Sequence, residues 1–208
     1  LYLIPTRDGE IRAYNTTNWA TSRDASSGTV RINDTLSGSA ISAYQLSGRG
    51  GGGSWQVKRA FFNFDTSGIS DTLSSATLKL YGRSSGSADF FVLASTQHQP
   101  LAGGDFGSRI NGWTTGDNTS NVTYYSDEIT SWSTSGYNDI TLNATALAAI
   151  KNDNDFTFCL VEADYDLTDT EPSSGTSYNT GFFWSDNTGT SKDPYIDYSA
   201  AVTDNAVF

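Results

Sequence analysis

The feature of this sequence that most restricts its fold is a strict alternation of apolar and polar side chains over residues 76–81. The segment reads Ala-Thr-Leu-Lys-Leu-Tyr, so Ala76, Leu78 and Leu80 occupy every second position. Successive side chains of a β-strand point to opposite faces, and this spacing predicts a strand with one face on a core and one in solvent. Similar strand-like segments recur between clusters of turn-forming residues: 57–65, 76–81, 89–94, 121–125, 139–142, 156–163, 181–184 and 195–198.

The composition favours a single all-β domain. Hydrophobic residues make up 37% of the 208 residues and aromatic residues 13%, which is enough to fill one core. All-β folds commonly reach about 200–250 residues as one unit. Long Gly- and Ser-rich connections favour a Greek-key or jelly-roll arrangement over a simple meander. We therefore expect one all-β, jelly-roll or Greek-key β-sandwich over residues 1–208, with a core at about 10–199 and an extension at each end.

One short helix is expected within this sandwich. Asn143 is suited to capping a helical turn, and Ala144, Leu147, Ala148 and Lys151 follow the helical period. The remaining connections are predicted to be loops.

A glycine-rich segment at residues 48–54 is expected to be a mobile surface loop, because it holds four consecutive glycines beside Arg49. A phosphate-binding glycine loop is followed by a helix, whereas the residues from Trp55 onward read as a strand. We therefore exclude a phosphate-binding loop at this position.

The charge pattern argues against two classes of partner. The formal net charge is −11 and the cationic residues are scattered, so a nucleic-acid partner is not expected. No segment approaches the roughly 20 consecutive apolar residues that cross a bilayer, so no membrane partner is expected either. The single cysteine, Cys159, lies in the apolar alternation of 156–163 and is predicted to be a buried side chain.

Three segments carry a resemblance to a known family. Residues 59–67 read RAFFNFDTS, residues 75–82 read SATLKLYG, and residues 193–199 read DPYIDYS. Together they resemble the core strand pair and closing strand of DNRLRE-type jelly-roll modules. That resemblance implies a carbohydrate-binding or adhesive module of a secreted bacterial protein.

A second resemblance is to virion proteins of tailed phages. It is carried by NWATSRDASSG at 18–28, by an NDITLNATALAAI segment and by the ending TSKDPYIDYS. It implies a particle-surface role such as capsid decoration, head fibre or tail-fibre module. Both resemblances imply binding without chemistry, and an extracellular or virion-surface location.

Four acidic residues near the end of a predicted strand are candidate calcium ligands: Asp164, Asp166, Asp169 and Glu171. Alternation is expected to place Asp164 and Asp166 on one face of the strand end. Calcium takes six to eight oxygen ligands, as the general chemistry of the ion requires. The spacing differs from an EF-hand loop, because Asp169 stands where that loop requires glycine. The sequence therefore favours a solvated acidic loop, with calcium binding as the alternative.

Four aromatic residues in polar, turn-rich stretches are candidate ligand contacts: Trp113, Trp132, Tyr124 and Tyr125. Their rings are suited to stacking on sugar faces or to packing against protein. We favour packing under a long loop, with ligand stacking as the alternative.

No catalytic site is predicted. His98 is the only histidine, and the strand-turn-helix elbow of a serine hydrolase is absent from the sequence. A chance pair of carboxylates is expected in so acidic a chain, and glycoside hydrolysis requires a defined separation of such a pair. We expect a non-enzymatic protein.

The apolar termini, LYLIP and AAVTDNAVF, are predicted to mediate assembly, since an exposed apolar strand tends to pair with a sheet edge or a neighbouring molecule. The favoured hypothesis is a structural protein of a tailed-phage particle that contacts other virion proteins or copies of itself. The alternative is a module that binds glycans.

Overall fold

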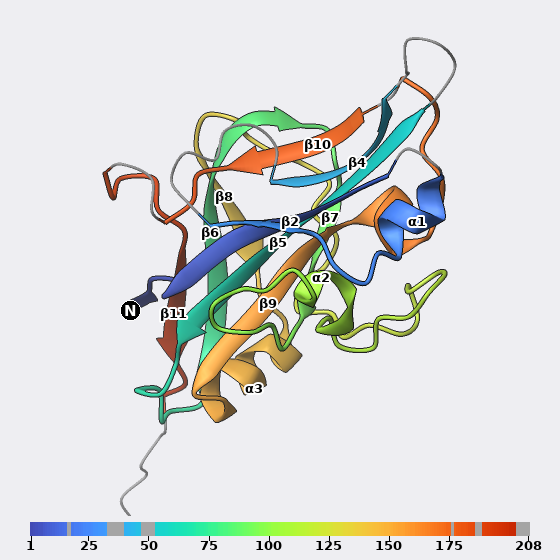
Figure 1. The fold of residues 1–208 in the computed structure, drawn as a ribbon. Helices are drawn as coiled ribbons and strands as arrows, with labels where there is room; N and C mark the ends of the chain where they lie inside the picture. The colour runs from blue at the N-terminus through green and yellow to red at the C-terminus, as the bar shows by residue number, and fades with distance from the viewer. Residues whose placement is uncertain (16–17, 33–39, 47–52, 176, 186–188, 203–208) are drawn as a thin grey trace, which may run out of the picture.

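The computed structural model describes residues 1–15, 18–32, 40–46, 53–175, 177–185 and 189–202, and these residues form an all-β sandwich (Figure 1). Most of the predicted glycine-rich loop and the end of the C-terminal extension, residues 48–52 and 203–208, lie outside the described part.

The strands differ greatly in length. They are β1 Tyr2–Leu3, β2 Arg7–Asn15, β3 Thr29–Arg31, β4 Ile41–Leu46, β5 Ser54–Asp65, β6 Leu73–Gly86, β7 Phe90–Ala94, β8 Tyr137–Thr141, β9 Asp155–Glu162, β10 Ser177–Phe182 and β11 Tyr195–Ala200. The helices are α1 Trp19–Arg23, α2 Asp105–Ser108, α3 Ala144–Asn152 and the π-helix η1 Ala163–Leu167.

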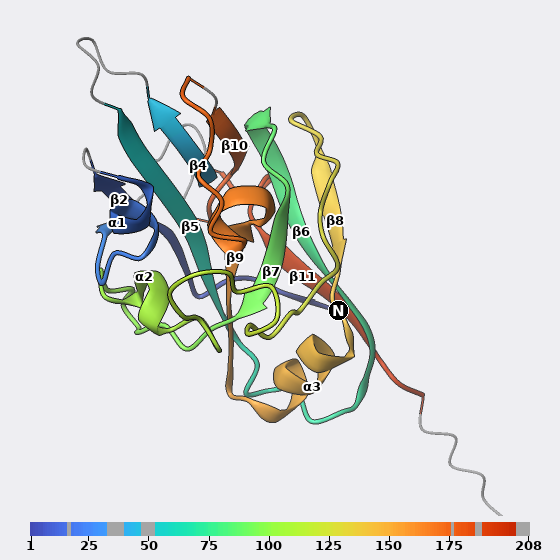
Figure 2. The same cartoon turned by 90° about the vertical axis from the view of Figure 1, so that its right-hand side faces the viewer.

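The strands form two sheets that face each other and are joined through β6. One sheet contains β1, β11, β6 and β8, and the other contains β3, β2, β5, β4, β10, β9 and β7. Within the described residues, every pair of neighbouring strands is antiparallel, and most neighbours are distant in sequence, such as β5 and β9. These crossovers are those of a Greek-key or jelly-roll sandwich. Figure 2 shows the two layers, with α3 closing the lower end.

β6 belongs to both sheets because it changes partners at Gly82. Up to Tyr81 the strand pairs with β8, and from Gly82 it pairs with β10. A Cβ atom added at Gly82 would lie 1.7 Å from the carbonyl oxygen of Ser133, so a larger residue does not fit at this corner. Strands that switch sheets commonly bend at such a position.

The apolar core consists of two clusters on opposite faces of β5. Phe62 and Phe64 point to the cluster between the two sheets, and Phe61 points to a second cluster under α1, α2 and the loops that follow β7. All three rings are buried. Because both faces of this strand are covered, its sequence is apolar on consecutive positions instead of alternating.

The structure confirms most of the predicted strands. The predicted strand 181–184 overlaps β10 only at its first two residues, because β10 ends at Phe182, and the predicted strand 121–125 is absent. Residues 121–125 form a loop that touches β7 through a single bridge between Tyr124 and Leu93. The backbone N–H of Val92 donates to the hydroxyl oxygen of Ser126, at 3.1 Å, so a side chain takes the place of a backbone partner and interrupts the pairing, which resumes as an isolated bridge between Phe90 and Ile129. Four strands early in the chain, β1 to β4, were not predicted.

The strands of the proposed DNRLRE-like pair, β5 and β6, are not hydrogen-bonded to each other. Their backbone partners are different strands, and their apolar side chains meet in the cluster between the sheets, where Phe62 and Leu78 both lie. Most of residues 59–67 and all of residues 75–82 therefore lie on two facing strands of the sandwich.

The predicted helix is confirmed as α3. The Asn143 side chain accepts a hydrogen bond from the backbone N–H of Ala146, at 3.1 Å, and caps the helix as expected. The short helices α1 and α2 and the π-helix η1 were not predicted. No helix in the described ranges is long and apolar enough to cross a bilayer.

Candidate functional site

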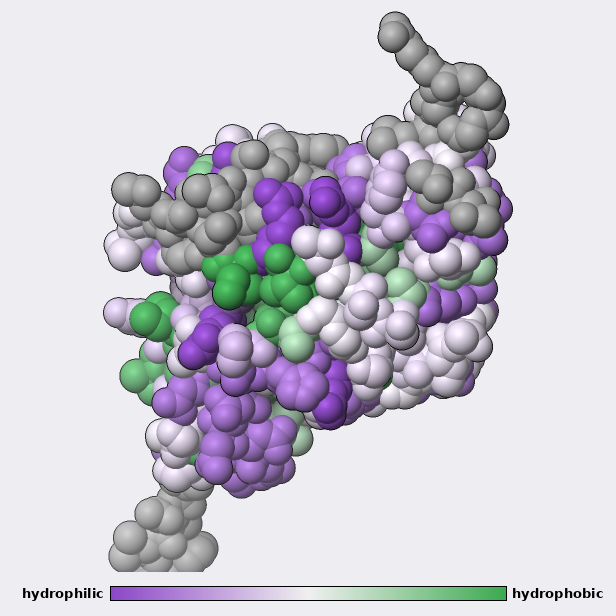
Figure 3. Space-filling model, viewed as in Figure 1, coloured by the Kyte–Doolittle hydropathy of each residue, from purple (hydrophilic) through white to green (hydrophobic). Residues whose placement is uncertain are grey.

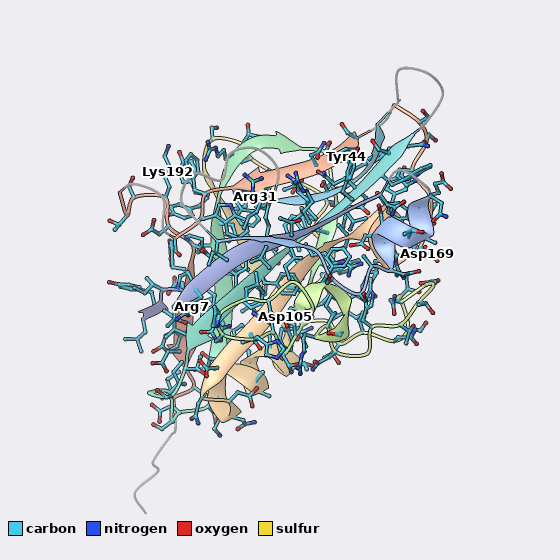
Figure 4. The ribbon with its side chains drawn as sticks, viewed as in Figure 1. Arg7, Arg31, Tyr44, Asp105, Asp169 and Lys192 are labelled. Carbon is cyan, nitrogen blue, oxygen red and sulfur yellow. The ribbon has the colours of Figure 1, made fainter. Side chains whose placement is uncertain are left out.

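The four acidic candidates do not share a common site. Asp166 is buried against arginine, Asp169 accepts a hydrogen bond from the indole N–H of Trp19 at 3.0 Å, and Glu171 accepts one from the indole of Trp55 at 3.0 Å. Figure 4 shows Asp169 next to α1, which carries Trp19. In the part of the chain that the structure describes, no group of three or more His, Cys, Asp or Glu side chains is placed to hold a metal ion.

The prediction that Asp164 and Asp166 share one face of a strand end is wrong, because β9 ends at Glu162 and the π-helix η1 begins. The Glu162 carboxylate accepts hydrogen bonds from the backbone N–H groups of Asp164, Tyr165 and Asp166, at 2.8–3.1 Å. These bonds start the helix. Asp166 consequently points inward while Asp164 is exposed.

Asp166 forms the centre of a buried charged cluster. Its Oδ2 and Oδ1 accept hydrogen bonds from Nε and Nη2 of Arg59, at 2.8 and 2.6 Å, and its backbone carbonyl accepts one from Nε of Arg23. The Arg59 guanidinium lies 4.1 Å from the centroid of Trp113 and 4.0 Å from that of Phe106. Hydrogen bonds to both partners make the buried Arg59–Asp166 pair tolerable, whereas Nη2 of Arg23 is buried without a hydrogen-bond partner among the described residues. Through Arg59, the cluster joins β5 to Asp166 of η1 and to the ring of Trp113.

The four candidate aromatic side chains pack against the protein and belong to two different clusters. Trp113 and Tyr124 pack at the α1/α2 side, whereas Trp132 and Tyr125 pack at the cluster between the sheets. The Trp132 indole donates to the carbonyl of Gly181, at 3.2 Å. The structure therefore does not bring the four rings together on one ligand-binding face.

His98 is held between two charged side chains. Its Nδ1 lies 2.5 Å from Oδ1 of Asp105, and its Nε2 lies 3.0 Å from Nη2 of Arg109. The nitrogen that faces a nucleophile in a serine hydrolase is here beside a guanidinium. The positions of these groups do not resemble a catalytic triad.

A row of aromatic rings on the outer face of the β1/β11/β6/β8 sheet was missed by the sequence interpretation. Tyr2, Tyr195, Tyr137, Tyr81 and Phe183 follow one another at centroid distances of 6.5, 5.3, 5.1 and 5.8 Å, each pair edge to face. The alternation in β6 predicts that the side chain of Tyr81 points to solvent. The other rings lie beside it because of the registers between β6, β8 and β11, which the sequence does not show.

The end of this row is an exposed apolar surface, which we call the edge patch and define as Leu1, Tyr2, Ile4 and Tyr195. Tyr2 is 73% exposed and Ile4 is 63% exposed. A hollow of about 570 Å³ lies here and is lined in part by Tyr2, Ile4 and Tyr195. Figure 3 shows green hydrophobic atoms at the left edge, where Figure 1 places the N-terminus.

A second surface lies along β2, where β3 no longer pairs with it. This β2 groove has a volume of about 1250 Å³, and its lining includes Arg12, Tyr14, Asn15, Asp24 and Gln56. Among the described residues, β3 pairs with Glu10, Ile11 and Arg12 of β2, and the groove lies beyond this pairing. The alternation of Ile11 and Ala13 with the polar residues of β2 was the available sequence signal for this strand.

Buried charges lie beside the β2 groove. The carboxylate of Glu10 is buried and lies 3.3 Å from Arg31 Nη1 and 3.8 Å from Lys58 Nζ. Burial raises the pKa of Glu10, and the nearby cations oppose that rise. Burial also lowers the pKa of Lys58, against the attraction of Glu10. Figure 4 shows Arg31 and Tyr44 on this side of the sheet.

The fold and its surfaces define a β-sandwich protein with an exposed aromatic edge and a polar groove. The sequence matches no protein-family model and no curated protein. The surfaces themselves must therefore carry any inference about function.

Proposed function

We propose that this protein is a non-enzymatic structural protein of a tailed-phage particle surface, such as a decoration or fibre protein, that assembles through its sheet edge. The observation that carries the proposal is the edge patch. Contiguous exposed apolar side chains on a soluble protein mark a surface that another molecule covers.

The backbone at this edge supports the same role. In the part of the chain that the structure describes, β1 is the last strand in its sheet and pairs with β11 alone, through Tyr2–Asp197 and Leu3–Ile196. An edge strand offers N–H and C=O groups to a further strand. The partner would be another virion protein or a second copy of this chain, with the Tyr2 and Ile4 side chains buried on assembly.

Light scattering and electron microscopy test this proposal. The purified protein, alone and with particles from its native source, is compared with the double variant Tyr2→Asp/Ile4→Asp. Ile32→Asp is the matched control, because Ile32 is also exposed and lies outside the edge patch. We expect wild type and control to assemble or to label the particle surface, and the double variant to do neither. If all three proteins behave alike, the edge patch does not mediate assembly. If particles from the native source lack the protein, the virion role is contradicted.

The second candidate function is a carbohydrate-binding or adhesive module, and the β2 groove is the observation that favours it. Its lining combines an exposed aromatic ring, Tyr14, with amide, hydroxyl and charged groups, the mixture that commonly recognises sugars. A glycan-array screen of the monomer tests this function. A monomer that binds glycans and never joins a particle favours it over the structural role.

A further inference from the structure

We infer that the β2 groove binds a saccharide that carries a carboxylate, with Arg12 and Tyr14 as its principal contacts. This inference rests on the carbohydrate-binding candidate function and names the class of ligand and the residues that select it.

The first argument is the cation of Arg12, which no described side chain binds directly. Its guanidinium is half-buried and lines the groove, and it acts on the carboxylate of Glu10 through its charge, without a hydrogen bond or ion pair among the described residues. The nearest acid on its strand, Glu10, is already engaged by Arg31 and Lys58. Three cations thus accompany one buried carboxylate here, in a chain whose net charge is −11. This local excess of positive charge favours an anionic group in the groove.

The guanidinium also restricts the kind of anion. A planar guanidinium binds a carboxylate through two parallel hydrogen bonds, which a neutral sugar hydroxyl does not reproduce. The acidic remainder of the surface repels a dense polyanion such as nucleic acid. Widely spaced carboxylates on sugar rings fit both conditions.

The second argument is the position of Tyr14 relative to Arg12. The two residues are separated by one position on β2, so their side chains leave the same face of the strand. Tyr14 is 53% exposed, which leaves its ring accessible to the apolar face of a pyranose. A sugar stacked on this ring would carry its ring substituents toward Arg12.

The neighbouring amide is held in one orientation. Gln56 lies opposite Tyr14 in the register of β2 and β5, and its Oε1 accepts a hydrogen bond from the Tyr44 hydroxyl, at 2.5 Å. Across the groove, Asp24 is fixed by its ion pair with Arg23, also at 2.5 Å. Side chains held in place before binding lower the entropic cost of ligand capture.

Calorimetric titration with defined oligosaccharides tests the inference. The probes are a trimer of galacturonic acid, sialyllactose, and the neutral trimer maltotriose. We expect at least one carboxylated probe to bind at least 10-fold more tightly than maltotriose. Arg12→Gln is expected to remove that preference, and Tyr14→Ala to weaken every probe at least 10-fold.

Two control variants separate the groove from the rest of the molecule. Arg7→Gln removes an arginine of the same strand that lines a different hollow, and Tyr2→Ala removes an exposed tyrosine of the edge patch. Both should bind like wild type, and circular dichroism should show every variant folded. Maltotriose binding equal to that of the acids, unchanged by Arg12→Gln, overturns the carboxylate inference and leaves the carbohydrate function standing. If no probe binds and the glycan array shows no binding either, both the carboxylate inference and the carbohydrate-binding function are overturned.

Discussion

Arg59 and Asp166 form a two-point ion pair in the interior of the protein although they are 107 residues apart in the chain. Neither side chain is exposed to solvent. The pair joins the central strand β5 to the π-helix η1, and the second arginine, Arg23, joins α1 to the same turn of backbone. Three segments that are distant in sequence therefore meet at one residue, Asp166.

Replacing that carboxylate is expected to destabilise the protein strongly. Asp166→Ala leaves the guanidinium of Arg59 buried without its counter-ion, which typically costs about 3–5 kcal/mol. Urea denaturation followed by fluorescence measures the change. Asp164→Ala is the matched control on the same π-helix, because its side chain is exposed, and it should change stability by less than about 0.5 kcal/mol. Similar losses for the two variants would show that the ion pair contributes little.

Glu162 makes stability depend on pH. Burial raises its pKa to about 8, from 4.5, and outweighs the opposing effect of the three backbone hydrogen bonds. Between these values the folded state binds more protons than the unfolded state, so the free energy of unfolding falls as pH rises from about 4.5 to 8. The slope from this group is at most about 1.4 kcal/mol per pH unit.

Glu162→Gln tests that dependence, because glutamine retains an acceptor oxygen and does not titrate. Denaturation at pH 5, 6, 7 and 8 should show a smaller decline for the variant than for wild type. Burial also raises the pKa values of Glu10 and Glu128, so some decline should remain. Parallel curves for wild type and variant would contradict the raised pKa of Glu162.

The side chain of Asn143 is expected to stabilise the protein through two hydrogen bonds, one to α3 and one to the loop that contains Tyr124. Its Oδ1 caps α3, and its Nδ2 donates to the backbone carbonyl of Tyr124, at 2.8 Å. Asn143→Ala should lower the free energy of unfolding by about 1–2 kcal/mol, since both bonds are lost. Asn143→Asp keeps the capping oxygen and loses only the donor, so it should cost less in thermal or chemical denaturation. An aspartate variant as unstable as the alanine variant would assign the effect to the Tyr124 contact.

The thiol of Cys159 should be inert in the folded protein. It is fully buried, and burial raises its pKa far above that of an ordinary cysteine. Since the thiolate is the reactive form, a thiol reagent such as Ellman's reagent should label it only after unfolding in denaturant. Rapid labelling under native conditions would show that β9 opens readily. The prediction that this side chain is buried is confirmed by the structure.

The strands that alternate cleanly were predictable, and so was α3. The 76–81 pattern lies within β6, and the Asn143 cap precedes α3 as expected. Local rules suffice in these cases, because periodicity and capping depend on residues a few positions apart. β2 was not predicted although Ile11 and Ala13 alternate with polar residues. Its sequence also contains the charged residues Arg7, Asp8, Glu10 and Arg12, which are more typical of a loop.

The surfaces could be predicted only in part. The apolar residues Leu1 to Pro5 can be recognised in the sequence, but the aromatic row beside them depends on strand registers that no local pattern specifies. The acids from Asp164 to Glu171 look like one group in the sequence. The tertiary structure separates them, because the arginines and indoles that bind them come from elements far away in the chain.

By itself the sequence determined that this chain is an all-β sandwich with a short capped helix and a buried cysteine, because those features follow from side-chain periodicity and burial preference. Only the tertiary structure decided which charges are paired in the interior, which rings lie side by side and where a groove opens. Contacts between residues a hundred positions apart depend on how the strands cross between the two sheets, and that crossing is a property of the whole chain.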